Sequence, residues 1–510
     1  MSNQKISRRN FLAKASIGAL TVGFSGMGDF TAHSQSKKVV RVAVRPPTRL
    51  TPGLLTDSPG QVITGAYGDY LFRLEGPEQE RQPSLVDHYE SSSDKRDWTF
   101  KVKEGVLFHH GTELTADDVK YTFQRISDPD TGSPASSLFS SLDTIEKTDK
   151  YTVKFKLTEP DPDFPLKFYD YNTSILARDF DYESKGETKP SGTGAYMIKE
   201  NIPGERLILE RNPNYFVPQA PYIDELHFLI VPEIETQTLM LQSGDVDIVT
   251  FAGIPQFQRF KRSGKINADM VRGGFHAPIS MRTDREPFND NRVRLAIKNC
   301  VDRPSMIESV LAGYGDIGHD HPIAPVYKWY TDLGTRDQDI EKAKELLSEA
   351  GYGNGLDISL YYPTNVAPCP DTALNFQRMV KPAGINVRLV GTTSDIYFQK
   401  YWLKANMTCT QWAHRTHVLN LLKLAYKTGG SWNEGHYKNS TLDELIRQAS
   451  TTLDDDKRQE YFTGIQEHIR EQGPASISFH QGLYGGSHER IKDFWMVRTG
   501  LAELRYLKLS

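Results

Sequence analysis

Alternating and continuous runs of apolar residues predict β-strands along the whole chain. Residues 39–44 (VVRVAV) end in an apolar run, and residues 151–157 (YTVKFKL) alternate between apolar and polar positions. A period of two places the apolar side chains of a strand on one face, so the second segment is expected to be half-buried. Further strands are predicted at 98–102, 106–108, 207–210, 225–231, 356–362, 385–390, 476–479 and 504–507.

A period close to 3.6 residues predicts helices between these strands. After Asp290, apolar residues at 293, 296, 297, 300 and 301 form one stripe of a helix. Thr115 begins a segment that resembles a capping box, and Ser440 is expected to cap another helix. Gly351 is expected to stop a helix over 340–350 at its C′ position. Other helices are predicted at 67–72, 235–242, 371–380 and 461–469.

The order of these elements indicates the fold class. Residues 356–390 predict one strand–helix–strand unit, and strands alternate with helices elsewhere without sequence repeats. At 510 residues the chain is too long for one core, so two or three lobes are expected. The pattern therefore predicts an α/β protein of several lobes.

The first 34 residues are predicted to be a signal peptide and not part of the fold. Residues 7–12 (SRRNFL) match the twin-arginine (Tat) export pattern closely, and a short, weakly apolar run follows over 13–26. Residues 32–34 (AHS) fit a cleavage site. No later stretch reaches about 18 consecutive apolar residues, so the mature chain is expected not to span a membrane.

Composition and charge exclude some classes of protein. Charged residues make up 25% of the chain and hydrophobic residues 38%, which is typical of globular proteins. The formal net charge of −4 gives no basic field for nucleic acid. Cys300, Cys369 and Cys409 allow at most one disulfide, and their wide separation excludes CxxC-type metal or redox spacing.

We find no set of residues that indicates catalysis or a cofactor. The sequence has no G-x-S-x-G, G-x-x-x-x-G-K-[ST] or H-E-x-x-H motif. The triplet His319-Asp320-His321 has metal-ligand side chains, but Pro322 follows it and a loop held by hydrogen bonds is favoured. His109 and His110 are also read as structural. We therefore expect no metal, no cofactor and no enzymatic activity.

Residues 411–439 (QWAHRTHVLNLLKLAYKTGGSWNEGHYKN) stand out for their aromatic and basic content. They hold two of the chain's six tryptophans, three histidines and an arginine, and a Gly-Gly turn precedes the second tryptophan. Such residues are suited to the wall of a ligand pocket, although a buried helix capped by a polar loop explains them equally well. The other motifs of the chain are needed to distinguish the pocket wall from the buried helix.

Several motifs together resemble the family 5 extracellular solute-binding proteins of ABC importers. The first is WTFKVKEGVLFHHG at 98–111, which is followed by LTADDV at 114–119. Further matches, in the family's order, are GTGAY at 192–196, RNPNY at 211–215, SGDVD at 243–247, PFND at 287–290 running into RVR at 292–294, and VDR at 301–303. They span nearly the whole mature chain. These motifs can also be explained as parts of the scaffold. Asp302 and Arg303, for example, are expected to form a local ion pair at the end of a helix.

The resemblance implies a two-lobed periplasmic binding protein fold with an extra inserted domain, the three-domain peptide-binding type. Hinge strands would join the lobes, which would close over the ligand. We place the signal peptide at 1–34, lobe I at 35–72, 190–275 and 480–510, the inserted domain at 73–189, and lobe II at 276–479.

One departure from the family bears on the ligand. Peptide-binding members resemble one another in placing an aspartate shortly after the tryptophan that corresponds to Trp412, where it pairs with the amino terminus of the ligand. Here no acidic residue occurs between Ala413 and Trp432, and the first is Glu434. The segment offers histidines, an arginine and lysines instead, which suggests an anionic or modified ligand; alternatively, Lys423 and Lys427 are a solvated helix face.

The resemblance implies a periplasmic, Tat-exported receptor that delivers a peptide or peptide-like solute to inner-membrane ABC permease subunits. We expect a monomer. The alternatives are a receptor for an opine, a sugar phosphate or a metal chelate, a Tat-exported enzyme, and a chaperone or signalling adaptor that uses the same cleft. Aromatic side chains would enclose the ligand, Arg415 would pair with its carboxylate or phosphate, and Asn433 would bind a backbone amide. The candidate ligand-binding residues are Tyr67, Trp412, His414, Arg415, Thr416, Trp432 and Asn433.

Overall fold

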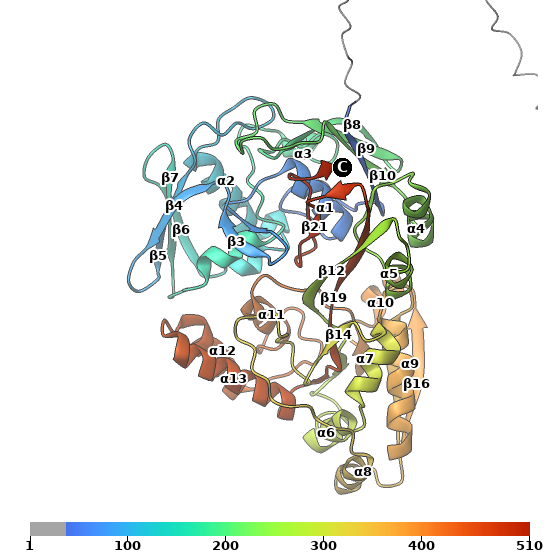
Figure 1. The fold of residues 1–510 in the computed structure, drawn as a ribbon. Coiled ribbons are helices and arrows are strands. Elements are labelled where there is room, and N and C mark those ends of the chain that lie inside the picture. The colour runs from blue at the N-terminus through green and yellow to red at the C-terminus, as the bar shows by residue number, and fades with distance from the viewer. Residues whose placement is uncertain (1–36) are drawn as a thin grey trace, which may run out of the picture. The chain divides into compact units, whose positions relative to one another are not determined.

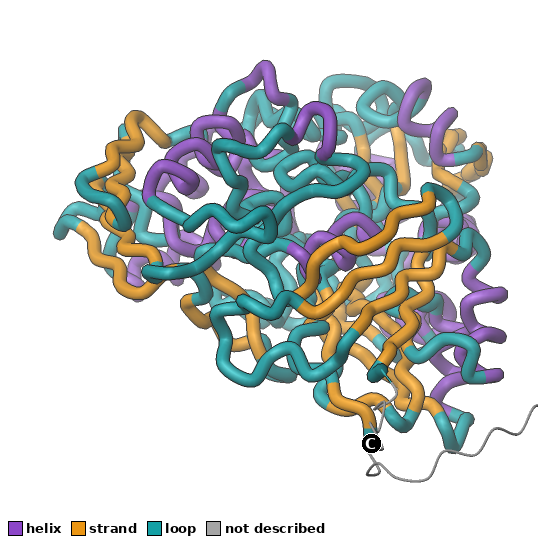
Figure 2. The backbone as a smooth tube through the Cα atoms, turned by 90° about the horizontal axis from the view of Figure 1, so that it is seen from above, coloured by secondary structure: helices purple, strands orange, loops and turns teal. Residues whose placement is uncertain are grey.

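The computed structural model describes residues 37–510, of which Lys38–Ser510 form one compact unit. The predicted signal peptide at 1–34, with its Tat motif and cleavage site, lies outside the described residues. Helices and strands are interspersed along the chain, and loops make up much of the backbone (Figure 2). Residues 318–339, for example, contain neither an α-helix nor a strand. Within residues 37–510, no helix is long and apolar enough to cross a membrane.

The largest sheet has eight strands and gathers segments from both ends of the described chain. Seven strands follow the order β12-β19-β11-β1-β10-β9-β8, and β14 pairs with β19. β1 is parallel to β10 and β11, whereas the other neighbours are antiparallel. The strands are β1 (Val39–Val44), β8 (Tyr196–Ile202), β9 (Arg206–Arg211), β10 (Glu225–Ile230), β11 (Ile248–Val249), β12 (Ile266–Phe275), β14 (Gly315–Ile317) and β19 (Phe479–His488).

A four-stranded antiparallel sheet lies within residues 86–157 and has an aromatic core. Its order is β4-β5-β7-β6, and its elements are β4 (Val86–Ser91), β5 (Asp97–Val102), β6 (Leu142–Lys147), β7 (Thr152–Leu157) and the helix α2 (Ala116–Ser127). Phe100, Phe123, Phe155 and Phe168 are buried together, with ring centroids 4.8–5.6 Å apart for the five closest pairs. The predicted capping box of α2 is confirmed, because the Thr115 and Asp118 side chains cap each other's backbone.

A five-stranded sheet of order β16-β15-β17-β13-β18 forms a third core. The predicted strand–helix–strand unit is confirmed: β15 and β16 are parallel and α9 joins them. Cys300, Cys369 and Cys409 are buried here as free thiols. The elements are β13 (Ile279–Met281), β15 (Leu356–Pro363), β16 (Ile385–Thr392), β17 (Met407–Cys409), β18 (Ala475–Ser476), α6 (Asn291–Asn299), α7 (Arg303–Leu311), α8 (Ile340–Glu349) and α9 (Cys369–Val380).

Two neighbouring strands connect the eight-stranded and five-stranded sheets. β12 ends at Phe275, four residues before β13 begins at Ile279, and β18 ends at Ser476, shortly before β19 begins at Phe479. β12 and β19 pair with each other over most of their length (Figure 1). The chain therefore passes between these two sheets through adjacent segments near His276 and His480.

The remaining elements surround these sheets. They are α1 (Ser58–Tyr67), α3 (Tyr182–Lys185), α4 (Ile234–Ser243), α5 (Ile254–Lys261), α10 (Ser394–Lys400), α11 (Val418–Ala425), α12 (Ser440–Thr451) and α13 (Asp455–Gln472), the short strands β2 (Phe72–Glu75), β3 (Glu80–Pro83), β20 (Ile491–Lys492), β21 (Trp495–Met496), β22 (Ala502–Glu503) and β23 (Lys508–Leu509), and the 3-10 helices 129–131, 136–139, 164–169 and 381–383.

The predicted helix over 67–72 is wrong, because α1 ends at Tyr67 and residue 72 begins the strand β2. A short buried apolar run reads equally well as helix or strand. The end of α1 is fixed from outside: the Gly194 N–H donates to the Tyr67 carbonyl at 2.9 Å. A Cβ at Gly194 would lie 2.4 Å from the Tyr67 carbonyl carbon, so only glycine allows this approach.

Three smaller predictions also need correction. Residues 106–108 form an isolated bridge from Leu107 to Glu113 and no strand, and residues 504–507 lie between β22 and β23. Asn439, one residue before the predicted cap Ser440, caps α12 by accepting from the Leu442 N–H. The stop at Gly351 is confirmed, since its φ of 89° lies in the left-handed region.

Candidate functional site

The aromatic-basic stretch 411–439 starts beside the connection between the two sheets. The backbones of Trp412 and His276 exchange two hydrogen bonds, at 2.8 and 3.2 Å. His417 then caps α11, with its Nδ1 accepting from the Leu419 N–H at 3.2 Å. Residues 413–417 thus form a loop between two fixed points, and polar side chains of this loop can face a cavity.

A cavity of about 580 Å³ opens beside this loop, a size typical of sites for small ligands. His414, Thr416 and His417 line it, as do segments distant in the sequence. Its aromatic residues are Tyr89, Trp98, Tyr169, Tyr327 and Trp329. Its charged residues are Arg81, Glu90, Lys95, Asp163, Lys328 and Arg498. Residues 414 and 416–418 are therefore one side of a cavity whose other sides come from residues 74–98, 162–169, 326–329 and 498.

His414 is held as a neutral imidazole with a defined tautomer. Its Nδ1 accepts the Gly274 N–H at 3.0 Å, so the ring hydrogen is on Nε2. The ring stacks on Tyr327, with centroids 4.9 Å apart and planes at 13°. Burial, with the charges of Arg498 and Arg415, lowers the pKa of His414 to about 3. At neutral pH the side chain therefore presents an N–H donor and no charge.

His417 and Arg458 both contact the Asp163 carboxylate at the same cavity. His417 Nε2 lies 3.1 Å from Asp163 Oδ2, and Arg458 Nη1 lies 3.3 Å from Oδ1 while its Nη2 binds Oδ2. Burial raises the pKa of Asp163, but the charges and hydrogen bonds of His417 and Arg458 outweigh burial and hold it below its usual range. This cluster ties residue 163 to α13 and to the cap of α11.

Arg415 and Trp432 lie together at a separate cavity of about 370 Å³. The Arg415 guanidinium carbon is 5.5 Å from the centroid of the Trp432 ring, a cation–π arrangement. Asp170 and Tyr171 line the same cavity. Burial raises the pKa of Tyr171 to about 12, and the neighbouring Arg415 opposes this rise. Arg415 thus lies near Trp432 and lines a different cavity from His414.

Trp412 is part of a buried cluster around Glu434. The indole N–H groups of Trp402 and Trp412 donate to Glu434 Oε1 at 2.7 and 3.0 Å. Burial raises the pKa of Glu434, whereas hydrogen bonds from Ser280, Trp402 and Trp412 lower it. Glu434, the first acidic residue after Trp412, therefore binds two tryptophans, and none of these three side chains lines the 580 Å³ cavity.

Tyr67 and Asn433 lie away from the cavities named so far. Tyr67 is fully buried in the core of the eight-stranded sheet, where its hydroxyl donates to the Leu50 carbonyl. The Asn433 amide closes a turn with the Tyr437 backbone, accepting at 3.0 Å and donating at 2.8 Å. Neither side chain lines the 580 Å³ or the 370 Å³ cavity.

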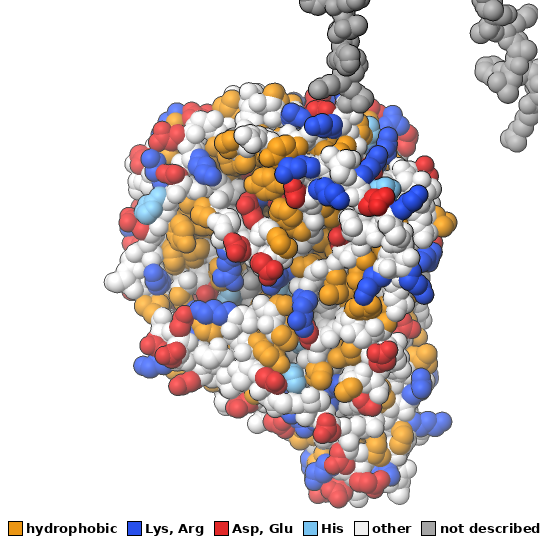
Figure 3. Space-filling model, viewed as in Figure 1, with side chains coloured by type: hydrophobic (Ala, Val, Ile, Leu, Met, Phe, Trp, Pro, Cys, Tyr) orange, Lys and Arg blue, Asp and Glu red, His pale blue; other side chains and the backbone are white. Residues whose placement is uncertain are grey.

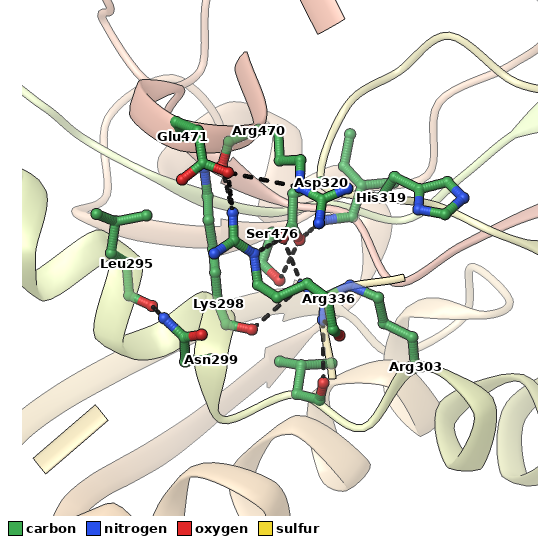
Figure 4. A network of polar contacts seen from close by, with 12 residues as sticks. Leu295, Lys298, Asn299, Arg303, His319, Asp320, Arg336, Arg470, Glu471 and Ser476 are labelled. Atoms are coloured by element: carbon green, nitrogen blue, oxygen red, sulfur yellow. Dashed lines mark hydrogen bonds and ion pairs between the residues drawn. The ribbon is translucent and has the colours of Figure 1, made fainter. Parts of the chain in front are cut away.

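The predicted local pair Asp302–Arg303 is wrong, and Figure 4 shows the network that replaces it. Asp302 caps α7 through the Ser305 N–H at 3.0 Å. Arg303 instead pairs with the fully buried Asp320, which also accepts from Ser476 Oγ and the Ile477 N–H at 3.1 Å and lies 3.4 Å from Arg336 Nε.

Asp320, the centre of the His319–His321 triplet, is thus the anion of a structural network. In the part of the chain described, no group of three or more His, Cys, Asp or Glu side chains has the geometry to hold a metal ion. His109 binds the Gly194 carbonyl through Nε2 at 3.0 Å.

A third, more open cavity of about 690 Å³ lies near Phe216 and Tyr506, lined also by Lys101 and Lys103. Positive and negative side chains are interspersed over the face in Figure 3, which agrees with the small net charge.

Three residues that line the 580 Å³ cavity were not predicted from the sequence, which are Tyr327, Asp163 and Arg498. They lie in loops far from residues 411–439 and carry no local motif.

Comparison with known proteins gives consistent results. Residues 80–430 match "Bacterial extracellular solute-binding proteins, family 5 Middle". The chain is 25% identical to "Heme-binding protein A" of Haemophilus influenzae over 460 residues, 81% of each chain. It is also 25% identical to "Oligopeptide-binding protein AppA" of Bacillus subtilis over 430 residues, 77% of each chain.

Solved structures share the fold. The Helicobacter pylori periplasmic binding protein DppA in complex with the peptide STSA matches with a TM-score of 0.79 and 24% identity, over 92% of this chain and 98% of that one. The A. tumefaciens protein AgaA in complex with agropinic acid matches with a TM-score of 0.81 and 21% identity, over 92% and 99%. These likenesses confirm the predicted α/β periplasmic binding protein fold. By its sequence match over 80–430, this chain belongs to the family 5 bacterial extracellular solute-binding proteins.

Proposed function

We propose that this protein is the substrate-binding component of an ABC importer and that it captures a peptide or peptide-like solute in the 580 Å³ cavity. The single observation that carries the proposal is the cavity itself in a chain of this family. Aromatic rings and polar groups from distant segments line it, as in sites that enclose a small solute. Relatives named for oligopeptide and di/tripeptide binding support the class of ligand.

We propose further that ligand capture uses hinge closure. In this proposal lobe I (35–72, 190–275 and 480–510) holds most of the eight-stranded sheet, the inserted domain is 73–189, and lobe II is 276–479. Two of the chain passages between the larger sheets occur in adjacent segments, at 275–279 and 476–479, which supports a hinge there. Closure would exclude water from the cavity and strengthen its polar contacts.

A blocked cavity tests the site. Thr416 is half-buried and lines the cavity, so Thr416→Trp fills space that the solute needs. The matched control is Thr441→Trp on the exposed first turn of α12. A ligand that binds only the folded state raises the melting temperature. We expect peptides to raise it for the wild type and the Thr441 variant and to have lost this effect for the Thr416 variant; an equal rise in all three would refute the site.

We also propose export to the periplasm by the Tat pathway, from the SRRNFL motif at 7–12 and the extracellular character of the family. Replacing Arg8 and Arg9 by lysine keeps the charge and removes the motif. We expect the variant to stay in the cytoplasmic fraction of the cell; normal export would refute the pathway.

We propose further that the protein is a monomer and that its partners are ABC permease subunits. Size-exclusion chromatography tests the monomer, and co-purification with permease subunits tests the partner.

A further inference from the structure

Two arginines that line the 580 Å³ cavity have no acidic partner in the described chain. Arg498 lies in the loop between β21 and β22, and its Nε is buried without a hydrogen-bond partner among residues 37–510. Arg81 lies on the strand β3, is exposed, and also forms no ion pair within those residues. The pKa of Arg498 is lowered by burial and also by the charge of Arg81, which places the two guanidinium groups close enough to repel.

The acidic residues of the cavity do not compensate this charge. Asp163 is already bound by His417 and Arg458. Glu90 is exposed and makes no ion pair with either arginine. Of the two lysines, Lys328 is paired with Asp455 at 2.6 Å, whereas Lys95 lies over the ring of Trp98. Glu78, whose charge opposes the lowering of the Arg498 pKa, is exposed, does not line the cavity and forms no ion pair with either arginine. Among the residues that line the cavity, Arg81 and Arg498 therefore have no acidic partner.

His414 adds a neutral donor to the same cavity. Because Nδ1 accepts the Gly274 N–H, the Nε2–H is left as the donor of a ring that lines the cavity. Within residues 37–510, Nε2 forms no hydrogen bond. Tyr327, stacked on this ring, is close to Arg498 as well, since the hydroxyl opposes the lowering of the Arg498 pKa.

We propose that the solute presents a carboxylate to this cavity and that Arg498, Arg81 and the Nε2–H of His414 bind it. A guanidinium matches a carboxylate with two parallel hydrogen bonds, and charge-assisted hydrogen bonds are about twice as strong as neutral ones. Arg498 is half-buried and its Nε has no partner within residues 37–510, so the anion would offset part of the cost of its desolvation as well as form contacts. The inference rests on the proposed function and specifies which group of the solute is recognised.

The test compares two mixtures of synthetic tripeptides of equal composition, one with free carboxyl termini and one amidated. The apparent dissociation constant of each comes from the dependence of the melting temperature on its concentration. For the wild type we expect the acid mixture to bind at least tenfold more tightly than the amide mixture. For Arg498→Gln and Arg81→Gln we expect the ratio to fall below threefold.

Arg378→Gln is the matched control, since Arg378 is exposed on α9 and lines none of the cavities named above. It should keep the wild-type ratio. The Arg81 side chain is exposed, so we expect the Arg81 variant to fold. This variant tests the inference even if the Arg498 variant does not fold. Equal binding of both mixtures by the wild type would overturn this inference and leave the proposed function standing. No binding of either mixture would overturn both.

Discussion

The Nε2 atom of His417 lies 3.1 Å from the Asp163 carboxylate, and this contact joins two distant parts of the chain. The tautomer follows from the helix cap, because Nδ1 already accepts the Leu419 N–H. Arg458, whose side chain is 3% exposed, is the second partner of the same carboxylate. A helix cap, a carboxylate and a buried guanidinium therefore hold one wall of the cavity in place.

Asp163→Asn should destabilise the fold, because it leaves the buried Arg458 with only the exposed Asp455, 4.0 Å away, as an anionic partner. Breaking one side of a buried ion pair costs roughly 3 kcal/mol of unfolding free energy. Chemical denaturation at neutral pH measures this loss. Asp493→Asn is the control, since Asp493 pairs with Lys508 at the surface and such pairs contribute about 1 kcal/mol or less. Equal stability of the Asp163 variant and the wild type would contradict the account.

Asp320→Asn removes the anion at the centre of the network in Figure 4. Arg303 is fully buried, so we again expect a loss of roughly 3 kcal/mol or more in the free energy of unfolding. Asp332→Asn, at an exposed carboxylate near His319, should change stability by less than about 0.5 kcal/mol. Thermal melts of the three proteins compare them, and identical melts would show that the network contributes nothing.

Gly194→Ala should destabilise the protein because the new methyl group would overlap the Tyr67 carbonyl, 2.4 Å away. Backbone atoms cannot rotate out of the way, so we expect a cost of about 2 kcal/mol, within the range for overpacked sites. Gly264→Ala is the matched control, since a Cβ there meets no atom within 4 Å. If both variants melt alike, the close approach of the two segments is not required for the fold.

Acid should destabilise the fold through buried imidazoles. Burial lowers the pKa of His276 to about 4 and of His321 to about 3, and it lowers that of His480 well below the usual range. The unfolded chain takes up protons below pH about 6.5, whereas these folded groups do not. The free energy of unfolding is therefore unaffected by these groups above that pH. As the pH falls from 7 to 5, it decreases by about 2 kcal/mol per imidazole.

Denaturation at a series of pH values checks this slope. His480→Phe removes one buried imidazole, both of whose nitrogens lack a partner within the described residues, and should flatten the curve. His88→Phe, at an exposed position, should leave the curve unchanged. An equal slope for all three proteins would contradict the assignment.

Local patterns predicted the elements whose signals lie within one segment. The capping box at Thr115 and the strand–helix–strand unit over 356–390 are of this kind. The helix expected at 67–72 failed because the end of α1 is set by Gly194, which lies far along the chain. The long strand β19 was missed because glycines interrupt its apolar pattern, and β12 was missed because only its first residue and its last three residues are buried.

In the candidate site, too, only residues with a local sequence signal were predicted. His414 and Thr416 were predicted from the composition of one loop and do line the cavity. Arg498, Tyr327 and Asp163 reach it from other loops, where each is an isolated polar or aromatic residue without a pattern around it. Only the tertiary fold brings such residues together.

A crystal structure of the protein grown with the tripeptide that stabilises it most tests the central claim directly. The account predicts the peptide in the 580 Å³ cavity, against Tyr327 and His414, with its carboxylate at Arg498. A peptide bound instead in the 690 Å³ cavity near Phe216 and Tyr506, with the first cavity empty, would contradict it.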